Sequence, residues 1–297
     1  MDMGKFKYIV LAGLVAAAVA TTFVVMKPRS PVTPLPNPNG YNFFVKAARM
    51  LGPGSADLDQ LDAPGLRALV SQNAGALKVA RQGFEYESRI ADFDATNMLD
   101  VLSSLKHLAW AFSAEGKLAE LENRREDAIR SYLDDVRLGQ ESTRGGPVIV
   151  RLVGIALEGI GLRSLQPLAQ SAGSNQCRQT ALALESLDAK EPPLAETLAE
   201  EDAYAAKVAA TQPITMALVR LIHAGALNKM KAPFINKVTG QMQVNQLTLR
   251  QTMIVFAARA YELEKKQGLK NLGDLTPGYL KVIPKDPRTG KVMVDPP

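Results

Sequence analysis

Cysteine, histidine and aromatic residues are scarce in this chain of 297 residues, and each scarcity excludes a class of protein. One cysteine cannot form an internal disulfide, and with two histidines it offers too few soft ligands for the usual zinc sites. An aromatic content of 6%, beside abundant alanine and leucine, favours packed helices over a β-sandwich. Because 46% of the residues are hydrophobic and 22% charged, we expect a folded chain.

The sequence also lacks the usual signatures of catalysis. No serine lies in a Gly-x-Ser-x-Gly elbow, and no Lys-Ser or Lys-Thr pair follows Gly145-Gly146 as a phosphate-binding loop requires. His107 and His223 share no motif, and Cys177 has neither a second thiol nor a neighbouring histidine, so we interpret all three as packing or surface residues. We therefore predict a protein that is not an enzyme and that holds no cofactor or metal.

One long apolar segment lies near the N-terminus. Residues 8–26 carry no charge and would span roughly 27 Å as a helix, which matches the hydrocarbon core of a bilayer. Basic residues flank the segment, and we predict a single-pass membrane anchor with a cytoplasmic N-terminus and an extracytoplasmic, periplasmic bulk. The alternative is a signal peptide cleaved after Ala20, because Ala18-Val19-Ala20 has the small-x-small form of a cleavage site.

The rest of the chain predicts a mainly α fold. Five prolines make residues 28–39 a semi-rigid spacer after the anchor of residues 1–27. We expect an α-helical domain over 40–244 and, over 245–297, a C-terminal helix with a loop and a short strand as a small cap. Apolar residues at helical spacing predict helices over 41–51, 62–82, 94–116, 118–141, 148–169, 174–188, 194–229 with a bend at Pro213, and 247–267. For 118–141 the alternative is a helix broken near Asn123-Arg124.

Part of this helical array resembles a tetratricopeptide repeat. Gly116 is followed twelve residues later by Ala128 and then by Tyr132, the spacing of small and aromatic residues typical of that hairpin. Small residues allow two antiparallel helices to approach closely, and the aromatic ring fills the space between hairpins. Since no second unit follows at the repeat length, we expect an irregular helical array and not a regular solenoid.

A glycine-rich helix follows a tight turn. Gly145, Gly146 and Pro147 predict an interhelix turn, with the proline suited to the start of the next helix. The helix over 148–169 is apolar nearly all round, which raises the possibility of a second membrane span. Its three charged residues would each cost roughly 2.5–3.5 kcal/mol at a bilayer centre, so we predict a buried central helix with close glycine packing.

Charge is distributed unevenly over the second half of the chain. Seven acidic residues lie within 185–202, and we interpret them as a solvated helix face and not as a calcium or acid–base site. From residue 220 onward, thirteen basic residues against five acidic ones give a local charge of +8. This basic region could meet anionic lipid or an envelope polymer, or it could be an ordinary basic surface; nucleic acid is not an expected partner.

The most specific pattern is at the C-terminus. Asp286 can accept backbone N–H bonds, Pro287 favours a turn, and Gly290 supplies a positive-φ position before a short strand over 292–294. The segment resembles the C-terminal part of type II secretion pseudopilins, in which it packs against the long N-terminal helix. The resemblance lacks the pseudopilin processing site, which argues against assembly into a fibre. The motif residues are Tyr279, Pro284, Asp286, Pro287 and Gly290.

Together, the anchor, the segment 37–41, the turn over 144–147 and the C-terminal motif resemble a family of single-span bacterial proteins of unknown function, of the planctomycete type. The resemblance implies location more than activity. We expect a non-enzymatic interaction or structural protein of the cell envelope whose helical array binds a protein partner. The alternatives are an accessory component of a secretion or pilus-like machine and an envelope hydrolase.

Overall fold

A computed structural model describes residues 34–52, 58–90, 98–211 and 213–294, with the backbone alone described at residue 59 and over 207–232. This part of the chain is mainly helical and contains no β-strand. Its α-helices are α2 (Gly40–Arg49), α3 (Ala63–Gly83), α4 (Met98–Leu121), α5 (Arg125–Glu141), α6 (Val148–Leu165), α7 (Ser174–Ala189), α8 (Leu194–Thr211) and α9 (Pro213–Lys265). Short 3₁₀ helices are η1 (Leu58–Gln60), η2 (Gln166–Gln170) and η3 (Leu272–Leu275).

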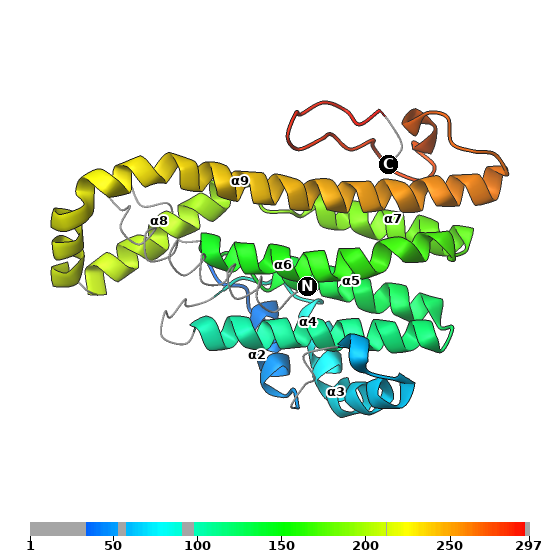
Figure 1. The fold of residues 1–297 in the computed structure, drawn as a ribbon, viewed down its shortest axis with the longest axis horizontal. Helices are drawn as coiled ribbons and strands as arrows, with labels where there is room; N and C mark the ends of the chain where they lie inside the picture. The colour runs from blue at the N-terminus through cyan, green and yellow to red at the C-terminus, as the bar shows by residue number, and fades with distance from the viewer. Residues whose placement is uncertain (1–33, 53–57, 91–97, 212, 295–297) are drawn as a thin grey trace.

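The helices form a stack. Helices α4 to α7 and the straight half of α9 run alongside one another, α2 and α3 close one side, and α9 covers the other (Figure 1). The segment after α9, including η3, lies on the outer face of α9 (Figure 1). Helix α8 and the first part of α9 project as a hairpin beyond the ends of the other helices (Figure 1). The prediction of a mainly α fold is confirmed.

The first helices begin where polar side chains cap them. Oδ1 of Asn39 accepts a hydrogen bond from the backbone N–H of Tyr41 at the start of α2. The side-chain amide of Asn39 also donates to the carbonyl of Arg89 at 2.7 Å, which ties the start of α2 to the segment that follows α3. Oδ1 of Asp62 accepts from the N–H of Gly65 at 2.9 Å, and a proline lies in the first turn of α3.

Two apolar clusters form most of the core. The smaller joins α2, α3 and α4 around Phe44 and Phe112, both fully buried. The larger joins α5, α6, α7 and α9 to the C-terminal segment, with Phe256 of α9 near its centre and Leu275 and Leu280 of that segment within it. Because the C-terminal segment contributes buried side chains to the larger cluster, it is part of the core and not an appendage.

Close approach of α5 and α6 requires glycine at the crossing points. A Cβ added at Gly139 would lie 2.6 Å from the carbonyl oxygen of Gly154, and one at Gly161 would lie 2.7 Å from that of Tyr132. Helix α6 is therefore the buried, glycine-packed helix that the sequence predicts. Among the described residues, no helix combines the length and the apolar character needed to cross a membrane. The predicted anchor over 8–26 lies outside the described residues.

Several predicted boundaries differ from the structure. Helix α4 continues through Gly116 to Leu121, and the turn before α5 comes at Asn123, whose φ is +59°. The predicted helix over 194–229 divides into α8 and α9, because Pro213 begins a new helix where a bend was expected. Helix α9 then runs without a break to Lys265, through Pro233 and through the domain boundary expected between 244 and 245.

The predicted C-terminal strand is wrong. Only a single antiparallel bridge forms, between Lys285 and Val292, and no strand extends from it. Val292 and Val294 are 51% and 71% exposed, so no neighbouring backbone or apolar surface completes a sheet there. The segment is a turn-rich cap and not a helix-loop-strand unit.

Candidate functional site

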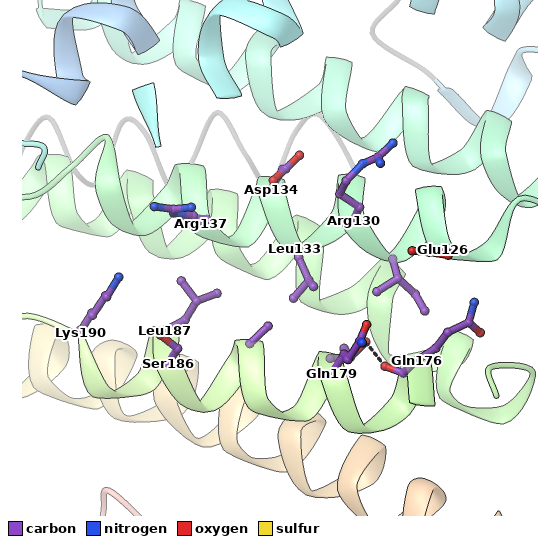
Figure 2. A pocket seen from close by; sticks show the side chains of 13 residues that line it. Glu126, Arg130, Leu133, Asp134, Arg137, Gln176, Gln179, Ser186, Leu187 and Lys190 are labelled. Carbon is purple, nitrogen blue, oxygen red and sulfur yellow. Dashed lines mark hydrogen bonds between the residues drawn. The ribbon is translucent and has the colours of Figure 1, made fainter. Parts of the chain in front are cut away.

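A groove of about 440 Å³ lies between α5 and α7. Leu133 of α5 points into its middle and Leu187 of α7 lies nearer one end, where Arg137 and Lys190 are, while Glu126 and Gln176 lie at the other end (Figure 2). The complete lining is Glu126, Ile129, Arg130, Leu133, Asp134, Arg137, Gln176, Gln179, Thr180, Ala183, Ser186, Leu187 and Lys190.

The groove exists because its two walls pack on different neighbours. Helix α5 packs against α4 and α6, whereas α7 packs chiefly against α9. On the side that faces the core, the two walls meet in the larger apolar cluster. Ile129 and Leu187 belong to this cluster, and Leu133 packs against it. In the groove itself Leu133 and Ala183 are half-buried and are bordered by polar side chains, whereas Ile129 and Leu187 are already buried.

The α5 wall is held in place by ion pairs to the preceding helices. Arg81 of α3 pairs with Asp134 at 2.7 Å and with Glu115 of α4, which also accepts a bond from Ser131. Burial raises the pKa of Asp134, and Arg81 only partly offsets this effect. Burial also acts to raise the pKa of Glu115, but the bonds from Arg81 and Ser131 outweigh it and hold that pKa below its usual range.

Arg137 is fixed at the rim of the groove. Its guanidinium donates to the backbone carbonyl of Phe84, and its Cζ lies 4.7 Å from the centroid of the Phe84 ring. A guanidinium has five N–H groups, so this single bond leaves donors for a ligand. Lys190 at the C-terminal cap of α7 is exposed, and its carbonyl accepts a bond from Arg144.

A buried ionic cluster lies at the centre of the stack. Arg151 of α6, whose side chain is 3% exposed, donates to Glu158 at 2.6 Å and to Glu191, which follows α7. Asn245 of α9 donates to Glu158, and Gln140 of α5 donates to Glu191 at 2.8 Å. Burial raises the pKa of Glu158 despite the opposing effect of Arg151. The cluster connects α5, α6 and α9 with the segment that follows α7, and its carboxylates are occupied by donors from the chain itself.

The three residues that resemble a tetratricopeptide hairpin lie at the α4–α5 interface. A Cβ added at Gly116 would lie 2.4 Å from the ring of Tyr132, so the structure brings these two residues together. The hydroxyl of Tyr132 donates to Glu120, and Tyr132 is only 3% exposed. Ala128 is fully buried one turn before the tyrosine.

The predicted interhelix turn connects α5 to α6. Gly145 has a φ of +74° and lies against the side chain of Arg89, so both its backbone and its surroundings favour glycine. The N–H of Gly146 donates to the carbonyl of Thr143, and Pro147 caps α6. No groove residue belongs to this turn.

The C-terminal motif forms a turn fastened to α9. The carboxylate of Asp286 accepts hydrogen bonds from the guanidinium of Arg288 and, at 2.7 Å, from its backbone N–H. These bonds lower the pKa of Asp286 to about 2. Gly290 has a φ of +70° and its N–H donates to the Asp286 carbonyl. The carbonyls of Pro284 and Pro287 accept from Met293 and from Gln243 of α9 respectively.

Tyr279 anchors this cap to the core. It is 4% exposed, its hydroxyl donates to Glu264 at 2.9 Å, and its ring contacts the ring of Tyr261. The guanidinium of Arg178 of α7 lies 4.8 Å from the centroid of the Tyr279 ring. The motif residues therefore have a structural role at two places along α9, with Tyr279 near Tyr261 and Glu264 and the Asp286 turn near Gln243 and Arg250, and none of them lines the groove.

The interpretation of the acidic segment as a solvated face is wrong. Six of the seven acids contact other parts of the chain, and only Asp202 is simply exposed. Glu196 and Glu200 pair with Arg89, and Glu201 accepts from the N–H of Val148 at the start of α6. The remaining contacts are those of Glu185 with the N–H groups of Lys281 and Val282, Asp188 with Arg250, and Glu191 with Arg151. Sequence reasoning missed these contacts because the partners of the acids, arginine side chains and backbone N–H groups, lie elsewhere in the chain.

The remaining candidates are dispersed. The ring of His107 lies against Trp110 on α4, and the side chain of His223 is among those not described. Cys177 is fully buried in the larger cluster, and burial raises the pKa of its thiol to about 11. Within the basic region, Arg250 is engaged by Asp188 and by the carbonyl of Lys285, whereas Lys237 is exposed.

Comparison of the chain with protein-family models, with curated proteins and with solved structures finds no match in any of the three.

Proposed function

We propose that this protein is a non-enzymatic interaction protein of the cell envelope, anchored through residues 8–26, whose helical array binds a protein partner. The observation that carries the proposal is the groove between α5 and α7, with its half-buried apolar floor and its polar rims. Such a surface is typical of protein and peptide recognition between helices. The membrane anchor and the extracytoplasmic location are inferred from the charge-free segment 8–26 and the basic residues that flank it.

The described residues give less support to an enzymatic function than to partner binding. Among the described residues, the ring of His107 stacks with Trp110 and donates no hydrogen bond to an acid. The buried carboxylates of the Arg151 cluster are satisfied by arginine and amide donors and do not face the groove. An acid–base pair needs a group within hydrogen-bonding reach of a substrate position, and the groove presents no such pair.

Site-specific photocrosslinking tests the proposed function. A benzoylphenylalanine placed at Ala183 in the groove should give a discrete protein adduct in intact cells. The same residue at Arg163, which is exposed on α6 outside the groove, should not. Equal labelling at both positions, or no adduct at Ala183, would contradict binding through the groove.

The C-terminal cap supports a second candidate, an accessory role in a secretion or pilus-like machine. The turn that resembles the pseudopilin segment packs on a long helix, as the resemblance implies, although that helix is α9. This role predicts co-purification with secretion proteins from solubilised membranes. Isolation of the chain alone under gentle conditions would count against it.

A further inference from the structure

The walls of the groove favour one backbone conformation in its occupant. Both walls are α-helices, whose backbone N–H and C=O groups are paired within each helix. No strand edge exists in the described residues to pair with an extended peptide. An extended occupant would leave most of its backbone groups unpaired over the apolar floor, whereas a helix satisfies its own.

The floor of the groove matches an apolar stripe. Ile129 and Leu133 on α5, and Ala183 and Leu187 on α7, are each four residues apart and lie one turn from one another along their helix. The lining of α5 from Glu126 to Arg137 extends over about 16 Å at ~1.5 Å per residue. A third helix of about three turns, with apolar residues at the same spacing, would lie along this floor.

The charged residues at the rim of the groove indicate which charge a bound segment should carry. Arg130 and Arg137 are seven residues apart on the same face of α5, about 10 Å at the usual helical rise, and Lys190 lies opposite the second of them. Asp134 is paired with Arg81 of α3, so it does not neutralise these cations. Arg130 pairs with Asp127 at 2.7 Å, but its side chain is 58% exposed, and such a surface pair is weak enough to exchange for the carboxylate of a ligand. Glu126 alone remains as an exposed negative charge, at the far end of the groove.

We propose that the groove binds an amphipathic helix of a partner protein, one that carries acidic residues about two turns apart beside an apolar stripe. This inference rests on the proposed function and specifies the chemistry of the partner. The acidic residues would meet Arg130, in exchange for its exposed pair with Asp127, and the Arg137–Lys190 end. The stripe would cover the half-buried Leu133 and Ala183. Gln179 on the α7 rim offers an amide that can bond to the same carboxylates.

Binding of a synthetic peptide tests the proposal directly. The probe is a fluorescent peptide of about 18 residues, long enough to form a helix, with leucines at i, i+4 and i+7 and glutamates two turns apart. Two matched peptides replace the glutamates with lysine or place a proline at the centre. Titrated into the full chain at low salt, the acidic helix should bind at least about tenfold more tightly than either, a difference of ~1.4 kcal/mol, and its affinity should fall as salt is added.

Variants of the protein locate the binding. Arg130→Glu combined with Lys190→Glu reverses two exposed charges without changing a core residue. This double variant should bind the acidic peptide at least about tenfold more weakly than the original protein. The control variant, Arg163→Glu combined with Lys237→Glu, reverses two exposed charges outside the groove, changes the net charge by the same amount, and should leave the affinity unchanged. Equal binding of the lysine or proline peptide, equal affinity in the double variant, or self-association of the chain that the double variant abolishes would each overturn the proposal.

The outcomes separate this inference from the proposed function. If the acidic peptide fails to bind while benzoylphenylalanine at Ala183 still gives its adduct, the function stands and the partner is not an acidic helix. If the peptide fails and the adduct is missing as well, both proposals fail.

Discussion

Gly116 and Tyr132 show how one hydrogen atom in place of a methyl group sets the spacing of two helices. A Cβ at Gly116 would lie 2.4 Å from a ring that is buried and held by Glu120, so the ring cannot simply rotate away. We expect Gly116→Ala to lower the free energy of unfolding by up to about 2 kcal/mol, since overpacking costs ~1–3 kcal/mol and the gain in helix propensity offsets about 1 kcal/mol of this.

Gly159 provides the matched control in the neighbouring helix. It also lies inside a helix, but nothing is within 4 Å of the position that a Cβ would take. Gly159→Ala should therefore raise the free energy of unfolding by up to about 1 kcal/mol. Urea denaturation followed by circular dichroism measures both variants, and changes of the same sign would contradict the packing argument.

Asp135 is the residue whose contribution should depend most on pH. Its side chain is fully buried, Ser113 donates to one oxygen, and the other oxygen has no partner in the described residues. Burial raises its pKa well above the ordinary value, since it disfavours the charged form. The folded chain thus binds this proton more tightly than the unfolded chain, and stability is lost as the pH rises from the ordinary pKa towards the folded one.

Asp135→Asn removes this titration and keeps the shape of the side chain. We expect the variant and the original protein to be similarly stable near pH 4 and the variant to be the more stable at pH 8, by about 1.4 kcal/mol for each unit of pKa shift removed. Denaturation at the two pH values gives the comparison, with the exposed Asp202→Asn as control. A difference that does not change with pH would show that Asp135 keeps the same charge over this range.

Residue patterns predicted contacts where the signal was local. Gly116, Tyr132 and the Asp286 turn could be found because small, aromatic or turn-forming residues have characteristic spacings. The acids of α8 could not be interpreted in that way. Their partners, Arg89 and the N-terminus of α6, lie far away in the sequence, and helical periodicity does not show which polar face another element will cover.

At the level of elements, Arg151 connects the α6 helix to the segment that follows α7. Its guanidinium satisfies both Glu158 and Glu191 in the interior. Arg151→Met should cost about 3–5 kcal/mol, because it leaves Glu158 buried and unpaired. Adding Glu158→Gln removes that charge, so the double variant should recover a large part of the loss, since Asn245 can still bond to the amide. A double variant as unstable as the sum of the two single variants would contradict a charge-based role.

The positions of helices were more predictable than their ends and junctions. Apolar spacing located α2, α3 and α7 within a few residues, because each has one face in the core. The sequence between 230 and 246 carries no clear stripe and includes Pro233, yet it is helical as part of α9. Packing of α9 against α7 and α6 stabilises the helix where the local sequence preference does not. The groove was not predicted, since it depends on α5 and α7 having different neighbours.

At the scale of the molecule, the cap, α7 and α9 share the larger apolar cluster with α5 and α6, and the smaller cluster continues from α4 and α6 into α2 and α3. Separate domains over 40–244 and 245–297 would require a boundary that few contacts cross. Here Tyr279 and Leu280 of the cap are buried, and Glu185 of α7 accepts bonds from two cap N–H groups. The contacts favour one cooperative unit.

The chain contains two natural probes for this cooperativity. Its single tryptophan, Trp110, is on α4, and its single cysteine, Cys177, is fully buried on α7 in the other cluster. Tryptophan fluorescence and brief labelling of the thiol across a urea series should give the same midpoint, because opening of either cluster exposes the other. If Cys177 becomes reactive at a clearly lower urea concentration than the fluorescence midpoint, the cap with α7 and α9 unfolds on its own, and the two-domain division of the sequence is then the better description.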